Sequence, residues 1–469
     1  MIVNAQQEWK STSAFQRWCR AQLVAKAKVL PQGCVRLIDA NGVWNLGEAA
    51  SWPQQHESSM SAPDQLLKPI ELHIRDPRFY SRMVMGGNLG AAESWMDGDW
   101  TCDRLPELIE LLVSQPKLLD RYENGAAKLR QVAERIGHWL RRNTRCNSRT
   151  NISQHYDLGN TFFELFLDPT MNYSSAVFDE LPQYPPRESL HRAQLRKMKR
   201  LCDTLQLGPN DHLLEIGTGW GSLACFAAKH YGCRVTTTTI SREQFEWARR
   251  RVENEGLTDR VTVLEQDYRD LDGQYDKIVS VEMIEAVGDQ FYDTFFKKCN
   301  RLLRPEGIML LQAITIVDER YRHHVKNVDF ICKHIFPGGS LPCISRLTQA
   351  AAMSSSMRVV KLDDYAEHYT ETLRRWRERF WDKIESVRSQ GYDERFIRMW
   401  DYYLAYCQAG FQARQINLVH MLFAKHSSRY DITRSTTSDW PQVDSLPNSA
   451  GDNNATNAHT TATRGSQPC

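Results

Sequence analysis

The sequence has no long apolar run, no excess of charge of one sign and no cysteine pair at metal-binding spacing. Its longest apolar stretch, residues 308–317, includes Gln312 and Thr315 and is too short to span a bilayer. The 59 basic and 57 acidic residues leave a net charge of +2, whereas proteins that bind nucleic acid usually carry a strong basic excess. These absences argue against a membrane-spanning protein and against nucleic acid as the main partner.

The cysteines also argue against a metal centre. All 12 are scattered, without a CxxC pair or a Cys/His cluster at zinc spacing, so we expect reduced thiols and no metal. The first ten residues, MIVNAQQEWK, lack the apolar run of a secretory signal, and a cytoplasmic location is therefore the expectation. The composition, 41% hydrophobic and 25% charged, is that of a soluble globular protein, and 469 residues allow two or three domains.

Residues 1–125 are predicted to form a smaller mixed α/β domain without a catalytic constellation. Residues 34–48 predict a hairpin, because an Asn-Gly pair supplies the positive φ angles of a tight turn between two apolar runs. Residues 70–74 alternate apolar and polar side chains, which indicates a strand. The pattern over residues 78–112 is helical, although glycines interrupt it.

Residues 126–150 are predicted to form a basic amphipathic linker. Apolar residues recur there at helical spacing, and residues 128–149 hold seven basic side chains and one acidic one. One interpretation is an interdomain helix that packs its apolar side on a neighbour. The other is a helix that contacts an anionic membrane surface, where each basic residue adds about 1 kcal/mol.

The last segment, residues 431–469, is predicted to be disordered. It is poor in apolar residues and rich in Ser, Thr, Asn, Asp and Pro. Such a segment buries too little surface to offset its ordering entropy.

A glycine-rich loop stands out in the remaining segment, residues 151–430. An apolar strand over residues 212–216 is followed by Gly217, Gly219 and Gly221, and then by a helix over residues 222–231. This order lets a ligand approach the backbone at a helix N-terminus. The spacing is GxGxG and not the GxGxxG of a dinucleotide site.

With Glu215 before the first glycine, the loop resembles motif I of the class I S-adenosylmethionine-dependent methyltransferases. Helices and strands continue to alternate after it, which predicts a doubly wound, mostly parallel, seven-stranded α/β sheet with ligands at the carboxyl ends of its strands. The expected elements are helix 243–255, strand 261–264, strand 277–281, helix 290–303, strand 308–316 and a last antiparallel strand 417–424.

Longer motifs narrow the resemblance. They are HYDLGN (155–160), LDPTMNYSSA (167–176), VSVEMIEAVG (279–288), FPGGSLP (336–342), His368-Tyr369 ahead of Trp376, and LGAAESWMDGDW (89–100). Together they resemble the cyclopropane-fatty-acyl-phospholipid synthases and the related mycolic acid methyltransferases, in family order over residues 70–425.

The resemblance implies an activity. In that family the sulfonium methyl of S-adenosylmethionine is attacked by a cis double bond of a phospholipid acyl chain, which leaves a carbocation. A base, thought to be a bound bicarbonate, then removes a proton from the transferred methyl and the cyclopropane ring closes. A carbocation needs a dry, electron-rich pocket. The partner implied is unsaturated phospholipid, reached by transient association with the inner membrane surface, and a homodimer is compatible with the resemblance.

The resemblance also assigns site residues. The bicarbonate would be held by Glu285, Tyr369, Ser175, Gln312 and Ile314. Many relatives have Cys in place of Ser175 and His in place of Gln312, and an amide donates a hydrogen bond but carries no positive charge. Three outcomes therefore remain open: a cyclopropane, a methyl- or methylene-branched chain, and a lipid-binding relative without catalysis.

Cofactor contacts follow in the same way, with Glu215 acting through the loop amides and Asp267-Tyr268 beside the adenine. The full set is Tyr173, Ser174, Glu215, Gly217, Gly219, Gly221, Thr239, Gln244, Asp267 and Tyr268. An aromatic and apolar insertion, residues 319–355, predicts either a wall of the acyl pocket or an extra packed helix. Methylation of nucleic acid is disfavoured, because no Asn-Pro-Pro-aromatic sequence follows strand 277–281.

Overall fold

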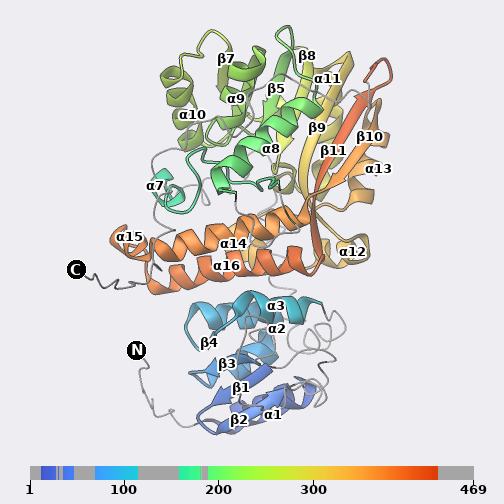
Figure 1. The fold of residues 1–469 in the computed structure, drawn as a ribbon. Coiled ribbons are helices and arrows are strands. Elements are labelled where there is room, and N and C mark those ends of the chain that lie inside the picture. Colours follow the sequence, from blue (N-terminus) through green and yellow to red (C-terminus); the bar gives the residue numbers. More distant parts are fainter. Residues whose placement is uncertain are drawn as a thin grey trace, which may run out of the picture.

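The computed structural model describes residues 12–27, 30, 35–46, 69–114, 158–179, 181 and 188–430, apart from the side chain of Lys26. The predicted basic linker, residues 126–150, and the predicted disordered tail, residues 431–469, lie outside the described residues. The described part contains two separate sheets (Figure 1).

The smaller sheet belongs to the N-terminal domain and has the strand order β2-β1-β3-β4. The hairpin of β1 (Val35–Asp39) and β2 (Gly42–Leu46) is confirmed, as is the strand β3 (Ile70–Ile74), which pairs with β1 in parallel. Helix α1 (Ala14–Ala27) precedes the hairpin. Alternate side chains of β3 are buried, as the sequence pattern indicates.

The interrupted helical pattern predicted for residues 78–112 is confirmed for most of the segment, but the strand that divides it was not predicted. The segment forms α2 (Arg78–Met96), the short strand β4 (Trp100–Cys102) and α3 (Leu105–Val113). The chain turns between α2 and β4 at Gly98, whose φ is +75°. The next residue, Asp99, is buried, and its carboxylate accepts hydrogen bonds from Ser94 (2.7 Å) and Arg78 (2.8 Å). These bonds hold the turn, and the sequence pattern gave no sign of them.

The larger sheet is a seven-stranded, mostly parallel sheet, as predicted. Its order is β10-β11-β9-β8-β5-β6-β7, and only β11 runs antiparallel to its neighbours. The strands are β5 (His212–Ile216), β6 (Arg234–Thr239), β7 (Val261–Glu265), β8 (Tyr275–Val281), β9 (Leu303–Ile316), β10 (Met357–Asp364) and β11 (Ile416–Lys425).

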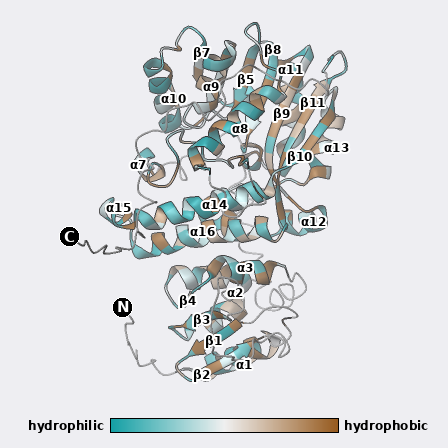
Figure 2. Cartoon of the chain, in the orientation of Figure 1, coloured by the Kyte–Doolittle hydropathy of each residue, from teal (hydrophilic) through white to brown (hydrophobic). Residues whose placement is uncertain are grey.

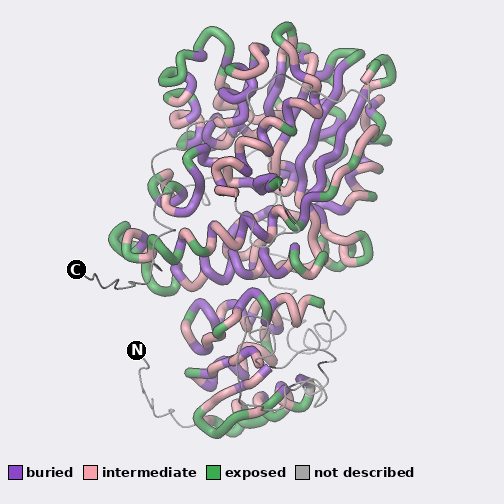
Figure 3. Tube along the Cα trace, viewed as in Figure 1, coloured by how far each residue is buried: buried purple, intermediate pink, exposed green. Residues whose placement is uncertain are grey.

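Helices cover both faces of this sheet, and each face has its own core. Leu213 packs into the cluster under one set of helices, whereas its neighbour Leu214 packs into the other, because successive side chains of a strand point to opposite faces. One set is α8 (Leu190–Thr204), α9 (Ser222–Tyr231) and α10 (Arg242–Asn254), and the other is α11 (Tyr292–Leu302) and α13 (Ile344–Ser354). Hydrophilic residues cover much of α10 (Figure 2), and the central strands are buried (Figure 3).

Strand β10 was not predicted. It lies at the edge of the sheet, and four of its eight residues are charged, so it lacks the apolar run of an inner strand. The insertion before it contains α12 (Asp318–Lys326) and a π-helical turn (Ile331–Ile335) as well as α13.

A pair of long helices, α14 (Ala366–Asp382) and α16 (Glu394–Gln412), lies between the large sheet and the N-terminal domain (Figure 1). The N-terminal domain docks on α16: Trp95 Nε1 donates to the carbonyl of Arg398 (3.0 Å), and Arg395 pairs with Asp97 (2.9 Å). Short elements α7 (Asn160–Phe163) and α15 (Ile384–Ser389) flank the pair. No helix among the described residues has the length and apolarity needed to cross a membrane.

Candidate active site

A cavity of about 510 Å³ lies at the carboxyl ends of β5, β6 and β8. Its walls come from the glycine loop, from α14 and α16, from the insertion, and from α2 and α3 of the N-terminal domain. In a doubly wound sheet this edge is where ligands bind. The cavity therefore joins the predicted cofactor loop to a surface that the N-terminal domain completes.

The glycine loop requires glycine at three positions, because Gly217, Gly219 and Gly221 have φ angles of +102°, +51° and +84°. A Cβ on Gly219 would meet no atom within 4 Å, so its backbone faces open space. Thr218 also lines the cavity, and its buried Oγ1 has no hydrogen-bond partner among the described residues. An open loop with an unused hydroxyl fits a ligand that lies against the backbone, as S-adenosylmethionine would.

Two of the predicted cofactor residues are placed differently from the others. Gly221 does not line the cavity: a Cβ there would lie 3.0 Å from the Cβ of Ala248 on α10, so the residue allows close packing of the loop against that helix. The predicted link from Glu215 to the loop amides does not involve Gly217 or Thr218, whose amides both donate to the carbonyl of Thr238 (3.0 Å each).

Glu215 lies in the cavity wall, where it accepts a hydrogen bond from Thr237 Oγ1 (2.6 Å). The parallel pairing of β5 with β6 places Glu215 directly beside Thr237. Burial raises the pKa of Glu215 to about 8.

The remaining predicted cofactor residues all line the cavity: Tyr173, Ser174, Gly217, Gly219, Thr239, Gln244, Asp267 and Tyr268. Thr239 Oγ1 donates to Gln244 Oε1 (2.9 Å). Asp267 Oδ2 pairs with Arg269 (2.6 Å), and the ring of Tyr268 packs edge-on against Phe295. The loop after β7 thus offers a carboxylate and an aromatic ring together on one side of the cavity.

The predicted catalytic residues gather around a side chain that was not predicted, Glu282. This residue follows β8, and its Oε1 accepts hydrogen bonds from the backbone N–H of Ser175 (3.0 Å) and from Gln312 Nε2 (2.7 Å). Its Oε2 accepts the hydroxyl of Tyr369 (2.6 Å). Of these four residues, Glu282 and Tyr369 line the cavity, whereas Ser175 and Gln312 do not. The carboxylate of Glu282 therefore separates the cavity from two of the groups that donate to it, the N–H of Ser175 and the amide of Gln312.

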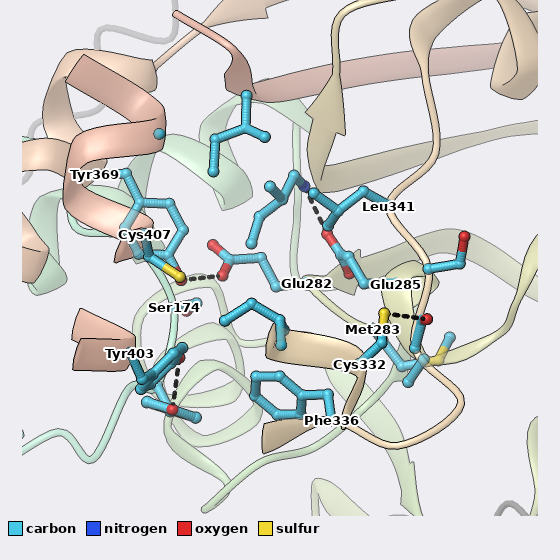
Figure 4. Close-up of a pocket in the computed structure, with 18 of the residues that line it drawn as sticks. Ser174, Glu282, Met283, Glu285, Cys332, Phe336, Leu341, Tyr369, Tyr403 and Cys407 are labelled. Atoms are coloured by element: carbon cyan, nitrogen blue, oxygen red, sulfur yellow. Dashed lines mark hydrogen bonds between the residues drawn. The ribbon is translucent and has the colours of Figure 1, made fainter. Parts of the chain in front are cut away.

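Glu285 lies beside Glu282 (Figure 4) and also lines the cavity. Its Oε1 accepts the backbone N–H of Ile314 (2.5 Å), and its buried Oε2 has no partner among the described residues. Burial, together with the nearby charge of Glu282, raises the pKa of Glu285 to about 8. Burial also raises the pKa of Glu282, but the three hydrogen bonds and Lys197 oppose that shift.

Two adjacent buried carboxylates resist double ionisation, since each charge disfavours the other. Glu282 has three donors and Glu285 has one, so the negative charge belongs on Glu282 and the proton on Glu285.

Lys197 is the second residue that the sequence reasoning missed. It is buried on α8, and its Nζ donates to Ser174 Oγ (2.7 Å) and Asn172 Oδ1 (3.3 Å). Desolvation lowers its pKa to about 8, and Glu282 is the largest opposing influence. Lys197 therefore places a positive charge next to Asn172 and Ser174, in the segment that includes the predicted cofactor residues Tyr173 and Ser174.

Both missed residues carried a signal in the sequence. Glu282 is an acidic residue directly after a buried parallel strand, at the edge where ligands bind. Lys197 falls on the apolar face of its helix, four residues after Ala193 and four before Leu201, where a charge is unusual.

The residues expected to hold bicarbonate do not fit an additional anion. The N–H of Ser175, the amide of Gln312 and the hydroxyl of Tyr369 all donate to Glu282. The N–H of Ile314 donates to Glu285. A bicarbonate placed among them would face a carboxylate already bound by the same donors.

Many aromatic and aliphatic side chains line the rest of the cavity, together with polar and charged ones such as Arg320, His324 and Asp329. Phe330, Ile331 and Phe336 reach it from the insertion, so part of the insertion forms cavity wall. Another part, α13, is a packed helix, so features of both interpretations are present. Tyr173 and Tyr403 join hydroxyls across the wall (2.8 Å). Leu108, Ile109 and Leu112 of α3 line the cavity from the N-terminal domain.

Fold and site together define a class I S-adenosylmethionine-dependent methyltransferase: a sheet with one antiparallel strand, a GxGxG loop and a ligand cavity at its strand ends. Comparison with known proteins narrows this class. The family model described as mycolic acid cyclopropane synthetase matches residues 143–421. The chain belongs to this cyclopropane synthase family, whose co-substrate is S-adenosylmethionine.

Individual relatives agree with this assignment. The chain is 36% identical over 397 residues to tuberculostearic acid methyltransferase UfaA1 of Mycobacterium tuberculosis, covering 82% of this chain and 86% of the relative. It is 39% identical over 365 residues to the cyclopropane-fatty-acyl-phospholipid synthase of Escherichia coli, covering 76% and 88%.

Among solved structures, the mycolic acid cyclopropane synthase CmaA1 in complex with SAH and CTAB superimposes with a TM-score of 0.55 at 30% identity. The match covers 59% of this chain and 98% of that chain.

Proposed function

We propose that this protein transfers the methyl group of S-adenosylmethionine to the cis double bond of an unsaturated phospholipid acyl chain and forms a cyclopropane fatty acid. The observation that carries the proposal is the single cavity that joins the glycine loop, two buried carboxyl groups and an apolar wall. An acyl chain bound along this apolar wall would place its double bond near the methyl group of the cofactor and near the negative charge of Glu282.

The residues support this chemistry in three ways. When bound, S-adenosylmethionine supplies an electrophilic methyl group. Aromatic and aliphatic side chains exclude water that would trap a carbocation on the acyl chain. The charge of Glu282, fixed by three donors, stabilises the positive charge that develops on that chain, because a preorganised charge is most effective where water is absent.

A second product has a specific observation in its favour. The relative UfaA1 is a tuberculostearic acid methyltransferase by name, whereas the Escherichia coli relative is a cyclopropane synthase. The same cation gives a ring if the transferred methyl group loses a proton directly, and a methyl-branched olefin if a chain carbon loses one. If a hydride first shifts from the methyl-bearing carbon to the cationic carbon, loss of a proton from the methyl group leaves a methylene branch. A methyl- or methylene-branched acyl chain is therefore the alternative product, and a lipid-binding protein without catalysis is the third possibility.

Mass spectrometry of membrane lipids tests the proposal. Cells that express the protein should accumulate acyl chains heavier by one CH₂, with fragments of a cyclopropane, and cells that express the Glu285→Gln variant serve as comparison. A branched olefin without a ring would establish the alternative product. An unchanged lipid profile, together with calorimetry that detects no binding of S-adenosylmethionine, would overturn the enzymatic function.

We also propose that the protein reaches its substrate by transient association with the inner membrane surface. The support is the basic pattern of residues 128–149, although this segment lies outside the described residues. Binding to anionic vesicles should weaken as salt rises, because screening shortens the reach of surface charge. The Arg141→Glu/Arg142→Glu variant should bind less in a sedimentation assay, and unchanged binding would remove this role from the segment.

A further inference from the structure

Glu282 occupies the position that an external anion would need. Three groups expected to hold bicarbonate, the N–H of Ser175, the amide of Gln312 and the hydroxyl of Tyr369, converge within 3.0 Å of its carboxylate. The amide of Gln312 is itself held in place, because its Oε1 contacts His420 Nε2 (2.9 Å). The donors thus form a preorganised anion site, and the anion in it is covalently part of the chain.

The backbone at Glu282 supports a specific role for this side chain. Its φ is +48°, in the left-handed region that favours glycine, and its N–H donates to the carbonyl of Gln312 (2.8 Å). A non-glycine residue held in this region carries local strain, and such strain is concentrated at functional sites. A glutamate is present here in spite of the strain, and its carboxylate binds three donors at the cavity wall.

The neighbouring charges favour an ionised Glu282. Glu285 has a single backbone donor and an unpartnered Oε2, so it is the member of the pair that keeps the proton. The other charged or titratable groups facing Glu282 are Lys197, whose cation stabilises the charge, and the hydroxyl of Tyr369, which donates to it. The pair therefore shares one negative charge, and that charge lies on the carboxylate with the most hydrogen bonds.

We propose that the carboxylate of Glu282 is the built-in anion and proton acceptor of this active site, in place of an external bicarbonate ion. The inference deepens the proposed function and rests on it for the identity of the substrate. Methyl transfer breaks a carbon–sulfur bond, whose electron pair remains on the sulfur, and the π electrons of the alkene form the new carbon–carbon bond.

The positive charge left on the adjacent carbon is then removed by proton transfer. Glu282 accepts a proton from the transferred methyl group, and the electron pair of that C–H bond closes the ring. The products are S-adenosylhomocysteine, the cyclopropane and a neutral Glu282, which returns its proton to solvent when the product leaves. No external base is needed for this balance.

Two substitutions of Glu282 separate the effect of its charge from the effect of the volume that its side chain occupies. Glu282→Gln keeps the shape and the hydrogen-bonding oxygen but removes the charge and the basicity. Glu282→Gly empties the donor site and relieves the backbone, since glycine adopts φ of +48° without strain. Glu306→Gln is the matched control, because Glu306 is exposed near the opposite end of the sheet, at the start of β9.

The experiment measures turnover of the full-length protein on vesicles of cis-monounsaturated phospholipid, in buffer freed of carbon dioxide and again with bicarbonate added. The original protein and Glu306→Gln should work equally well in both buffers. Glu282→Gln should lose about 100-fold or more in both, the scale of a lost general base. Glu282→Gly should be as slow without bicarbonate and recover at least tenfold when bicarbonate or formate is added.

A binding measurement provides a readout independent of activity. Calorimetric titration with bicarbonate should detect binding to Glu282→Gly and none to the original protein, while thermal denaturation checks that each variant is folded. Stimulation of the original protein by bicarbonate, near-normal turnover of Glu282→Gln, or failure of Glu282→Gly to bind bicarbonate would overturn the inference. If the original protein methylates no lipid, the proposed function fails, and the titration still decides whether Glu282 fills the anion site.

Discussion

At the scale of single residues, Glu285 couples the active site to the stability of the fold. Burial raises its pKa to about 8 from a usual 4.5, so the folded protein holds a proton that the unfolded chain releases. Its stabilising contribution is complete below pH 4.5 and is lost as the pH rises through 8. Glu282 and Tyr292 are the titratable groups electrostatically coupled to it.

The variant Glu285→Gln tests this coupling. Glutamine resembles the protonated acid, so the two proteins should have similar free energies of unfolding near pH 4.5. As the pH rises towards 8, the variant should become the more stable one, by at most about 1.4 kcal/mol per pH unit. Urea denaturation across this pH range measures the difference. A constant difference would mean that Glu285 is ionised in the folded protein.

At the scale of elements, the loop between β5 and α9 contains glycines with two different functions. Gly221 packs against α10, where a Cβ would lie 3.0 Å from that of Ala248, whereas Gly219 faces open space at the cavity. Both have positive φ, so an alanine at either position is strained by about 1 kcal/mol.

The pair Gly219→Ala and Gly221→Ala should therefore separate stability from binding. We expect Gly221→Ala to destabilise the protein by roughly 2–3 kcal/mol, because steric overlap adds to the backbone strain, while folded protein keeps its affinity for S-adenosylmethionine. Gly219→Ala should cost only about 1 kcal/mol but weaken that affinity. Denaturation curves and calorimetric titration give the two quantities. The reverse pattern would place Gly221, not Gly219, against the cofactor.

At the scale of the whole molecule, the N-terminal domain completes the cavity of the methyltransferase domain. Ile109 of α3 lines the cavity, whereas Glu107, two residues earlier on the same helix, is exposed. Trp95 and Asp97 anchor the domain on α16. The domain without catalytic residues therefore contributes part of the binding surface.

The variant Ile109→Trp tests that contribution. The larger ring should fill the part of the cavity that Ile109 lines and reduce turnover of phospholipid by tenfold or more, about the energy of one displaced apolar contact. Affinity for S-adenosylmethionine should not change, because none of the predicted cofactor residues belongs to α3. Glu107→Trp is the control, with the same new side chain on the outer face of α3. Equal turnover by both variants would show that the acyl chain does not reach this wall.

Much of the architecture could be predicted because it depends on local patterns. Strands β5 and β3 occupy the predicted residues, and the positive φ angles of the glycine loop follow from residues that tolerate them. The edge strand β10 and the break between α2 and α3 could not be predicted. The first has a polar edge-strand composition, and the second depends on a buried aspartate bound by residues of the neighbouring helix.

The sequence by itself determined the class of fold, the position of the cofactor loop and most of the side chains around the cavity, since each depends on residue type and spacing along the chain. Only the tertiary structure decided how these side chains meet. Glu282 and Glu285 are three residues apart, but the donors that distinguish them come from Ser175, Gln312 and Tyr369, which are distant along the chain. Hydrogen bonds and burial between distant segments set the charge of each carboxyl group, and spacing along the chain carries no such information.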